Sequence, residues 1–275
     1  MRSLQSRVLA LLFALVTAPL SGFAQGGSQR DEATETFVRG FVRFLAYHEA
    51  GHMLMGQIAN LNTHPDWSKA DREDYADKFA MILLEPDADD PDGIDEIISA
   101  AGGWLQVDSG VIRDEPHAPP QDRALDIICL LYGSNPEAFA EFSDVVGTDS
   151  GCAELYQELE REIDDVFRDY SGQFGRSIDI VYGPPTGGMD DAAAFLRDSG
   201  VVEDLKDDIE AEFYLTHRTT IQAMSCAGKA KSDTFYFDTV RSANPADDHF
   251  IITLCYEMID ARLKYGMRGF EDETG

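Results

Sequence analysis

The chain has 275 residues, of which 51 are acidic and 22 are basic, giving a formal net charge of −29 at pH 7. Such an acidic surface repels nucleic acid and anionic lipid, so we expect no nucleic-acid partner. The length is enough for one substantial hydrophobic core or two small ones.

The first 24 residues have the pattern of a secretory signal peptide. Arg2 and Arg7 form a short positive region, residues 8–18 form an apolar run, and Gly22 and Ala24 precede the expected cleavage site. The apolar run is too short to favour a membrane span, although an uncleaved anchor is the alternative. We therefore expect an exported protein, periplasmic or secreted, with no membrane attachment after cleavage.

The remaining chain predicts a largely helical protein with a small sheet. Residues 25–33 are small and polar and are expected to form a flexible mature N-terminus. Apolar residues at spacings of three and four predict a first helix over residues 34–60. Further helices are expected over residues 68–84, 92–101, 121–132, 136–142, 152–170, 201–213 and 256–264. Runs of β-branched and aromatic residues predict strands over residues 177–181, 219–224, 234–237 and 250–254.

These elements predict an α+β fold that is zincin-like, with a sheet contributed by the C-terminal half. The helical metal-binding part should cover residues 34–172 and the α/β part residues 173–275. We expect the two parts to pack together as one domain.

The four cysteines favour disulfides, because an even number in an exported chain is typical of an oxidised framework. None of them belongs to a CxxC pair, which argues against a structural zinc knuckle. Three connectivities are possible. We favour the local pairs Cys129–Cys152 and Cys226–Cys255, each of which would link elements within one half of the chain.

The motif HEAGH at residues 48–52 predicts a zinc site. Side chains four apart on a helix point the same way, so His48 and His52 can bind one ion. Glu49 is placed to act as a general base beside the metal. The alternative is a pair of structural histidines in an apolar helix.

The third ligand is expected from a later helix. Met55 and Ile58 stand where a HExxHxxGxxH motif would have glycine and histidine, so that type of site is excluded. The segment EDYAD at residues 73–77 supplies Glu73 as a ligand and Asp77 as a hydrogen-bond acceptor for a ligand histidine. Asp74 and Asp77 are the alternative ligands.

A group that stabilises the transition state is also required. We favour His117, which lies in a proline-rich loop, for this role. The alternatives are Tyr132, His217 and Tyr256.

The chain contains the motifs HEAGH, EDYADKFA and QDRALDIICLLYGSNPEAF, followed by Cys152. Together they resemble an exported metallopeptidase family of bacteria that was first catalogued as a domain of unknown function. The C-terminal half is similar to another part of that family. The similarity lies in the segments VEDLKDDIEAEF, SCAGKAKSDTFYF and IITLCYEMIDARL. The resemblance implies a zincin-like fold of the gluzincin type. It also implies that His48, His52 and Glu73 ligate zinc and that Glu49 is the base.

The order of these segments differs from the family pattern, in which the Cys…CYE segment precedes the HExxH helix. Here that segment follows it, and the Asn-Ala part of the family pattern is altered to AKSDTFYF. We hypothesise a circular permutation, in which the C-terminal strands form the sheet beside the first helix. Structures with nearby termini tolerate such rearrangements.

The sequence therefore predicts an exported zinc-dependent metallopeptidase that acts on a peptide or protein substrate. Two alternatives remain open: a zinc-binding interaction protein without activity, and an amidohydrolase of small molecules. An intact Glu49 favours an enzyme, because metal binding alone does not require it. The sequence does not indicate an oligomeric state.

Overall fold

The computed structural model describes residues 28–57, 66–84, 87–106, 118–147, 150–170, 175–228 and 235–265, with only the backbone described at residues 28–32 and at Tyr265. The predicted signal peptide lies outside these residues. No helix within the described ranges is long and apolar enough to cross a membrane.

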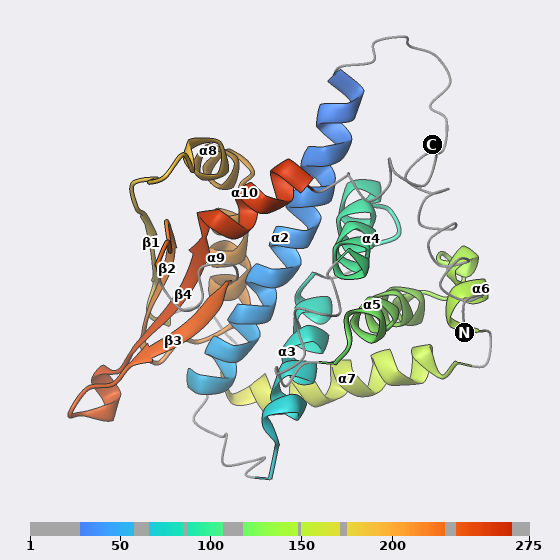
Figure 1. The fold of residues 1–275 in the computed structure, drawn as a ribbon. Coiled ribbons are helices and arrows are strands. Elements are labelled where there is room, and N and C mark those ends of the chain that lie inside the picture. The colour runs from blue at the N-terminus through green and yellow to red at the C-terminus, as the bar shows by residue number, and fades with distance from the viewer. Residues whose placement is uncertain are drawn as a thin grey trace.

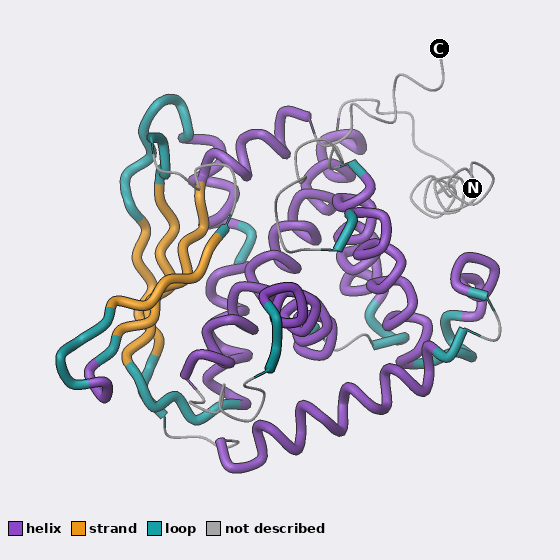
Figure 2. The backbone as a smooth tube through the Cα atoms, turned by 60° about the horizontal axis from the view of Figure 1, so that its bottom comes forward, coloured by secondary structure: helices purple, strands orange, loops and turns teal. Residues whose placement is uncertain are grey.

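The helices form the larger part of the molecule and the sheet forms one side of it (Figures 1 and 2). The α-helices are α2 (Ser28–Gln57), α3 (Lys69–Leu83), α4 (Pro91–Leu105), α5 (Pro120–Ser134), α6 (Ser143–Val146), α7 (Cys152–Phe167), α8 (Asp190–Asp198), α9 (Val201–Glu212) and α10 (Tyr256–Tyr265). Short 3-10 helices cover Ala140–Phe142, Arg168–Tyr170 and Pro245–Asp247. The predicted α+β class is confirmed.

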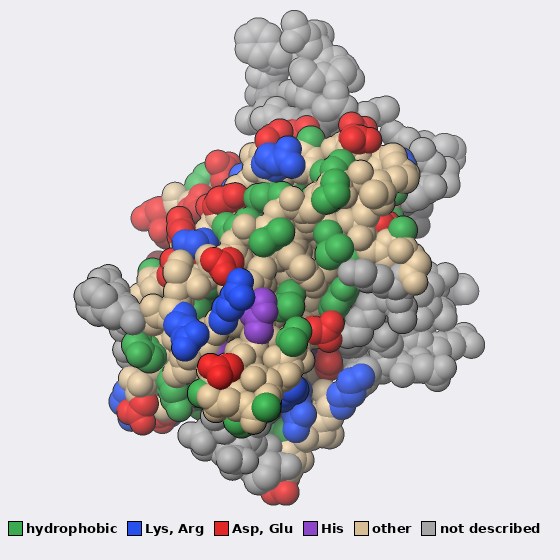
Figure 3. Space-filling model, turned by 90° about the vertical axis from the view of Figure 1, so that its left-hand side faces the viewer, with side chains coloured by type: hydrophobic (Ala, Val, Ile, Leu, Met, Phe, Trp, Pro, Cys, Tyr) green, Lys and Arg blue, Asp and Glu red, His purple; other side chains and the backbone are tan. Residues whose placement is uncertain are grey.

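The sheet contains β1 (Ile178–Tyr182), β2 (Arg218–Met224), β3 (Tyr236–Val240) and β4 (His249–Cys255), in the order β1-β2-β4-β3. β1, β2 and β4 are parallel, and β3 runs antiparallel to β4 at the edge. One register row runs across the sheet through Asp179, Thr220, Ile251 and Asp238, which places an exposed acid on each of the two edge strands. On the face of the molecule where the sheet lies, acidic, basic and hydrophobic side chains are intermixed (Figure 3).

Helix α2 lies at the centre of the fold, between the sheet and helices α3, α4, α5 and α7 (Figure 1). It packs against α3, α4, α9 and β4. Its apolar side chains, among them Phe41, Phe44, Tyr47 and Leu54, are almost completely buried. A helix that is apolar on more than one face is expected in the middle of a core. Both halves of the chain contribute buried residues to one continuous hydrophobic core. The expected division into domains stays a prediction.

Several elements differ from the sequence expectation. Helix α2 begins at Ser28, inside residues 25–33, where a flexible segment was expected. Asp31, Glu32 and Ala33 favour a helix start, because acids suit the first turn and alanine has the highest helix propensity. Helix α8 was not predicted, since its nine residues are too few to show a clear period.

The helix expected over residues 136–142 is largely a turn. The Asn135 side chain accepts a hydrogen bond from the Ala138 backbone N–H at 3.1 Å, and the Asn135 carbonyl accepts one from Phe139 at 3.0 Å. Such local side-chain bonds compete with helix formation. The regular structure there begins only at the 3-10 helix Ala140–Phe142.

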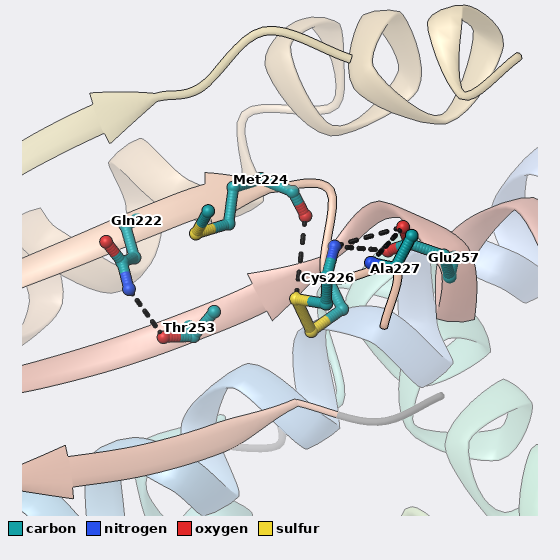
Figure 4. Close-up of a disulfide and its surroundings, with 7 residues drawn as sticks. Gln222, Met224, Cys226, Ala227, Thr253 and Glu257 are labelled. Carbon is teal, nitrogen blue, oxygen red and sulfur yellow. Dashed lines mark hydrogen bonds between the residues drawn. A yellow bond between two sulfur atoms is a disulfide. The ribbon is translucent and has the colours of Figure 1, made fainter. Parts of the chain in front are cut away.

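The cysteines form the same two pairs that the sequence favoured. Cys129 of α5 is bonded to Cys152 at the start of α7, and Cys226 is bonded to Cys255 at the end of β4. Beside the second disulfide, the Glu257 carboxylate accepts hydrogen bonds from the backbone N–H groups of Cys226 and Ala227 at 2.8 to 3.0 Å (Figure 4). The segment after β2 is therefore held to the start of α10 by a covalent bond and by a carboxylate.

Replacing Gly40 by alanine is expected to destabilise the protein. A Cβ atom at this position of α2 would lie 2.3 Å from the Glu96 carbonyl oxygen of α4, so the two helices would have to separate. Overpacking of this kind costs about 1–3 kcal/mol, which outweighs the gain of about 1 kcal/mol in helix propensity. We expect a net loss of up to about 2 kcal/mol in the free energy of unfolding, measured by urea denaturation.

Gly102→Ala is the matched control, because a Cβ there meets its nearest atom, in the Phe37 ring, at 3.3 Å. Its stability should change by less than about 1 kcal/mol. Equal losses in the two variants would contradict a specific close approach at Gly40.

Candidate metal centre

The two histidines of the HExxH motif lie on one face of α2. His48 is 3% exposed, and its ring meets the His52 ring edge-on, with 4.7 Å between the centroids. The two Nε2 atoms are 3.1 Å apart. The helix therefore aims one nitrogen of each imidazole at a common point, as the spacing of four predicts.

Helix α3 brings a carboxylate to the same point. Glu73 Oε2 lies 2.9 Å from His52 Nε2 and 3.3 Å from His48 Nε2. The close approach of α3 depends on Gly51, where a Cβ atom would already lie 3.3 Å from the Ala76 Cα. The start of α3 is fixed by a capping box, in which Ser68 and Asp71 satisfy each other's backbone N–H groups.

The donor set of His48, His52 and Glu73 fits a zinc ion. Two imidazole nitrogens and one carboxylate oxygen form a common set of protein ligands for catalytic zinc. Donors about 2.0–2.1 Å from a tetrahedral ion lie about 3.4 Å from one another. The observed separations of 2.9, 3.1 and 3.3 Å are close to this value. Among the described residues, this cluster can hold a metal ion with all donor atoms within 4.8 Å of one another.

Asp77, one turn after Glu73 on α3, contacts His48 from the other side of its ring. Asp77 Oδ1 lies 2.8 Å from His48 Nδ1, which directs Nε2 towards Glu73 and His52. Burial acts to lower the pKa of His48, but the Asp77 carboxylate and neighbouring acids raise it to about 9. Asp77 therefore contacts His48 and is not one of the three converging donors, and its role in supporting a metal ligand stays a prediction.

The alternative ligand Asp74 lies elsewhere. Its Oδ2 accepts a hydrogen bond from Lys78 Nζ at 2.7 Å, and its side chain is 46% exposed. Asp74 is therefore part of an ion pair within α3 rather than of the converging set.

Arg123 of α5 is a residue of the site that the sequence analysis did not assign. Arg123 Nε donates to Asp77 Oδ2 at 2.6 Å, and Nη2 donates to Oδ1 of the same carboxylate. Burial opposes ionisation of Asp77, but Arg123 and His48 lower its pKa to about 2. One sequence signal was present: Arg123 lies four and eight residues before Ile127 and Leu131, which places it on the buried face of α5.

Glu49 and the residues considered for transition-state stabilisation occupy different environments. Glu49 is half-buried and directly follows His48. His117 lies outside the described residues. Tyr256 is fully buried and donates to the Gly183 carbonyl at 3.0 Å. Tyr132 is nine residues beyond Arg123 on α5, which places it about 13 Å along the helix.

The fourth candidate, His217, lies at the C-terminal end of α2. Its backbone N–H donates to Gln57 Oε1 at 3.1 Å, and its ring packs edge-on against Phe250. The structure therefore places His217 beside the sheet and the last turn of α2, one full turn beyond His52.

Comparisons with known proteins identify the family. The family model described as "Putative metallopeptidase" matches residues 5–165, which is more than half of the chain and includes α2, α3 and the Cys129–Cys152 pair. Searches among curated proteins and among solved structures each found no match. The family implies a bound metal ion and a peptide or protein substrate. On the matched residues, the chain belongs to this metallopeptidase family, in agreement with the resemblance of its motifs.

Proposed function

We propose that this protein is an exported zinc-dependent metallopeptidase, with His48, His52 and Glu73 as the zinc ligands. The observation that carries the proposal is the convergence of three donor atoms at 2.9 to 3.3 Å. The Asp77 contact adds to it, because it orients the His48 ring with Nε2 towards the other two donor atoms. A pair of structural histidines would need hydrogen-bond partners, but it would not require both Nε2 atoms to face each other and the same carboxylate oxygen.

Zinc bound at this site would lower the pKa of water towards about 7 and polarise a scissile carbonyl. The chain supplies the acid–base chemistry through Glu49. Its half-buried carboxylate accepts the proton of the attacking water and then donates it to the leaving amine nitrogen. His48 and His52 are held against rotation by α2 and by their contacts with α3, so the site needs little rearrangement before reaction.

Export is supported by two independent features. Disulfides persist in oxidising compartments, and the structure contains two of them. The first 24 residues also have the pattern of a signal peptide. We place the mature protein in the periplasm or outside the cell.

Glu49→Gln is expected to abolish peptide hydrolysis while zinc remains bound. The amide cannot accept the proton, and the loss of a general base lowers rates by about 10²–10⁴-fold. Turnover of a broad peptide library and zinc content by mass spectrometry measure the two effects. Glu35→Gln, at an exposed position of the same helix, is the control.

Unchanged peptide hydrolysis by the Glu49→Gln variant would contradict the proposed mechanism. Zinc binding by the wild type without hydrolysis of any peptide would favour the interaction protein, and cleavage of small amides alone would favour the amidohydrolase.

Glu73→Gln is expected to weaken zinc binding by at least about 100-fold. The loss of affinity should be larger than that caused by removing a residue that only hydrogen-bonds to a ligand. Asp74→Asn is the matched control, because Asp74 is the adjacent acid but pairs with Lys78. Competition with a chromophoric chelator measures both affinities. A larger loss in the Asp74 variant than in the Glu73 variant would show that the third ligand is wrongly assigned.

A further inference from the structure

We propose that Arg123 is a positioning residue of the metal site, which acts on His48 through Asp77. This inference rests on the proposed zinc function and adds a third helix, α5, to the two that carry the ligands. Arg123 is 5% exposed and lies 46 residues beyond Asp77 in the chain. Among the hydrogen bonds of the described residues, Arg123 contacts Asp77 and does not contact His48. An effect of Arg123 on His48 must therefore pass through the Asp77 carboxylate.

The carboxylate of Asp77 is held by both of its oxygens. Oδ1 contacts His48 Nδ1 and Arg123 Nη2, and Oδ2 accepts from Arg123 Nε at 2.6 Å. A two-point contact of this kind fixes the plane of the carboxylate, which a single hydrogen bond would not do. The ring of His48 is therefore oriented by a group that cannot itself rotate.

The guanidinium is fixed in turn by an aromatic surface. The Arg123 Cζ atom lies 3.5 Å from the centre of the Trp104 ring of α4. Trp104 is 7% exposed and meets the Phe41 ring of α2 edge-on at 5.5 Å. The contacts form a closed path from α2 through α4, α5 and α3 back to His48.

An arginine has properties that a lysine could not supply here. Its planar fork matches both carboxylate oxygens, and its flat face stacks on an indole ring. Lysine at this position would keep the positive charge but would lose the second hydrogen bond and the stacking. Arg123→Lys therefore separates the orientation of Asp77 from simple charge compensation.

The covalent frame supports the same arrangement. Arg123 lies in the first turn of α5, and Cys129 of the same helix is bonded to Cys152 of α7. The disulfide restrains the helix that presents the guanidinium, although it does not touch the metal ligands.

The test measures metal binding in addition to activity, in the full-length mature protein. Zinc affinity is obtained by chelator competition, and the visible absorption of bound cobalt(II) reports the geometry of the site. Arg123→Lys is expected to weaken zinc binding by about tenfold and to change the cobalt spectrum, with kcat lowered and KM unchanged. The reason is that His48 is no longer held in one orientation.

The control is Arg43→Lys on α2. Arg43 also pairs with a buried carboxylate, Glu96, at 2.8 Å and lies over an aromatic ring, Tyr47, at 5.5 Å. It contacts none of the three proposed ligands in the described structure, so its zinc affinity and cobalt spectrum should match the wild type.

Asp77→Asn distinguishes an action through Asp77 from a general effect on folding. In that background, Arg123→Lys should cause no further loss of zinc affinity, because residues acting through one contact are not additive. Thermal unfolding followed by circular dichroism shows that each variant is folded. If the Arg123→Lys protein does not fold, the double variant Asp77→Asn/Arg123→Met replaces it, because it removes both charges of the pair. This double variant should bind zinc as weakly as Asp77→Asn alone.

Two results would overturn the role of Arg123: zinc affinity within about twofold of the wild type in the folded Arg123→Lys protein, or additive losses in the double variant. Failure of the wild type to bind zinc or cobalt would instead overturn the proposed function itself. The two failures are therefore distinguishable.

Discussion

The placement of two histidines on the enclosed side of the central helix, His48 buried and His52 half-buried, is the constraint on which this structure depends. Helix α2 is enclosed by α3, α4, α9 and the sheet, so the polar edges of His48 and His52 need partners from the protein or from a bound ion. Helix α3 supplies those partners at a spacing of one turn, Glu73 towards both Nε2 atoms and Asp77 towards Nδ1 of His48. The packing of α3 against Gly51 is what brings the carboxylates within reach.

Each polar group that enters this interior requires another to stabilise it. Asp77 orients His48, but a buried carboxylate is unfavourable without a cation, and Arg123 provides one. The guanidinium is itself buried, and the face of Trp104 accommodates it. This series of contacts ends at the Trp104 ring, which packs in the hydrophobic core and needs no charged partner. The apolar core and the polar site are thus one arrangement.

The sheet and the helices also depend on one another. The matched family segment ends at residue 165, whereas the strands lie between residues 178 and 255. The last turn of α2 nevertheless bonds to the sheet, since Gln57 Nε2 donates to Thr219 Oγ1 at 2.5 Å and Gly56 lies close to Phe250. A sheet beside α2 is what the permutation hypothesis requires, and the permutation itself stays a prediction.

The sequence by itself determined what depends on local geometry. A spacing of four on a helix fixes how His48 and His52 point, and the same rule relates Glu73 to Asp77. It also indicated the fold class and the family, through periodicity and motifs. Only the tertiary structure decided that Asp77 faces Nδ1 of His48 while Asp74 pairs with Lys78, and that Arg123 binds Asp77. These contacts join separate helices, and no local period encodes them, because they depend on how closely small residues let the helices pack.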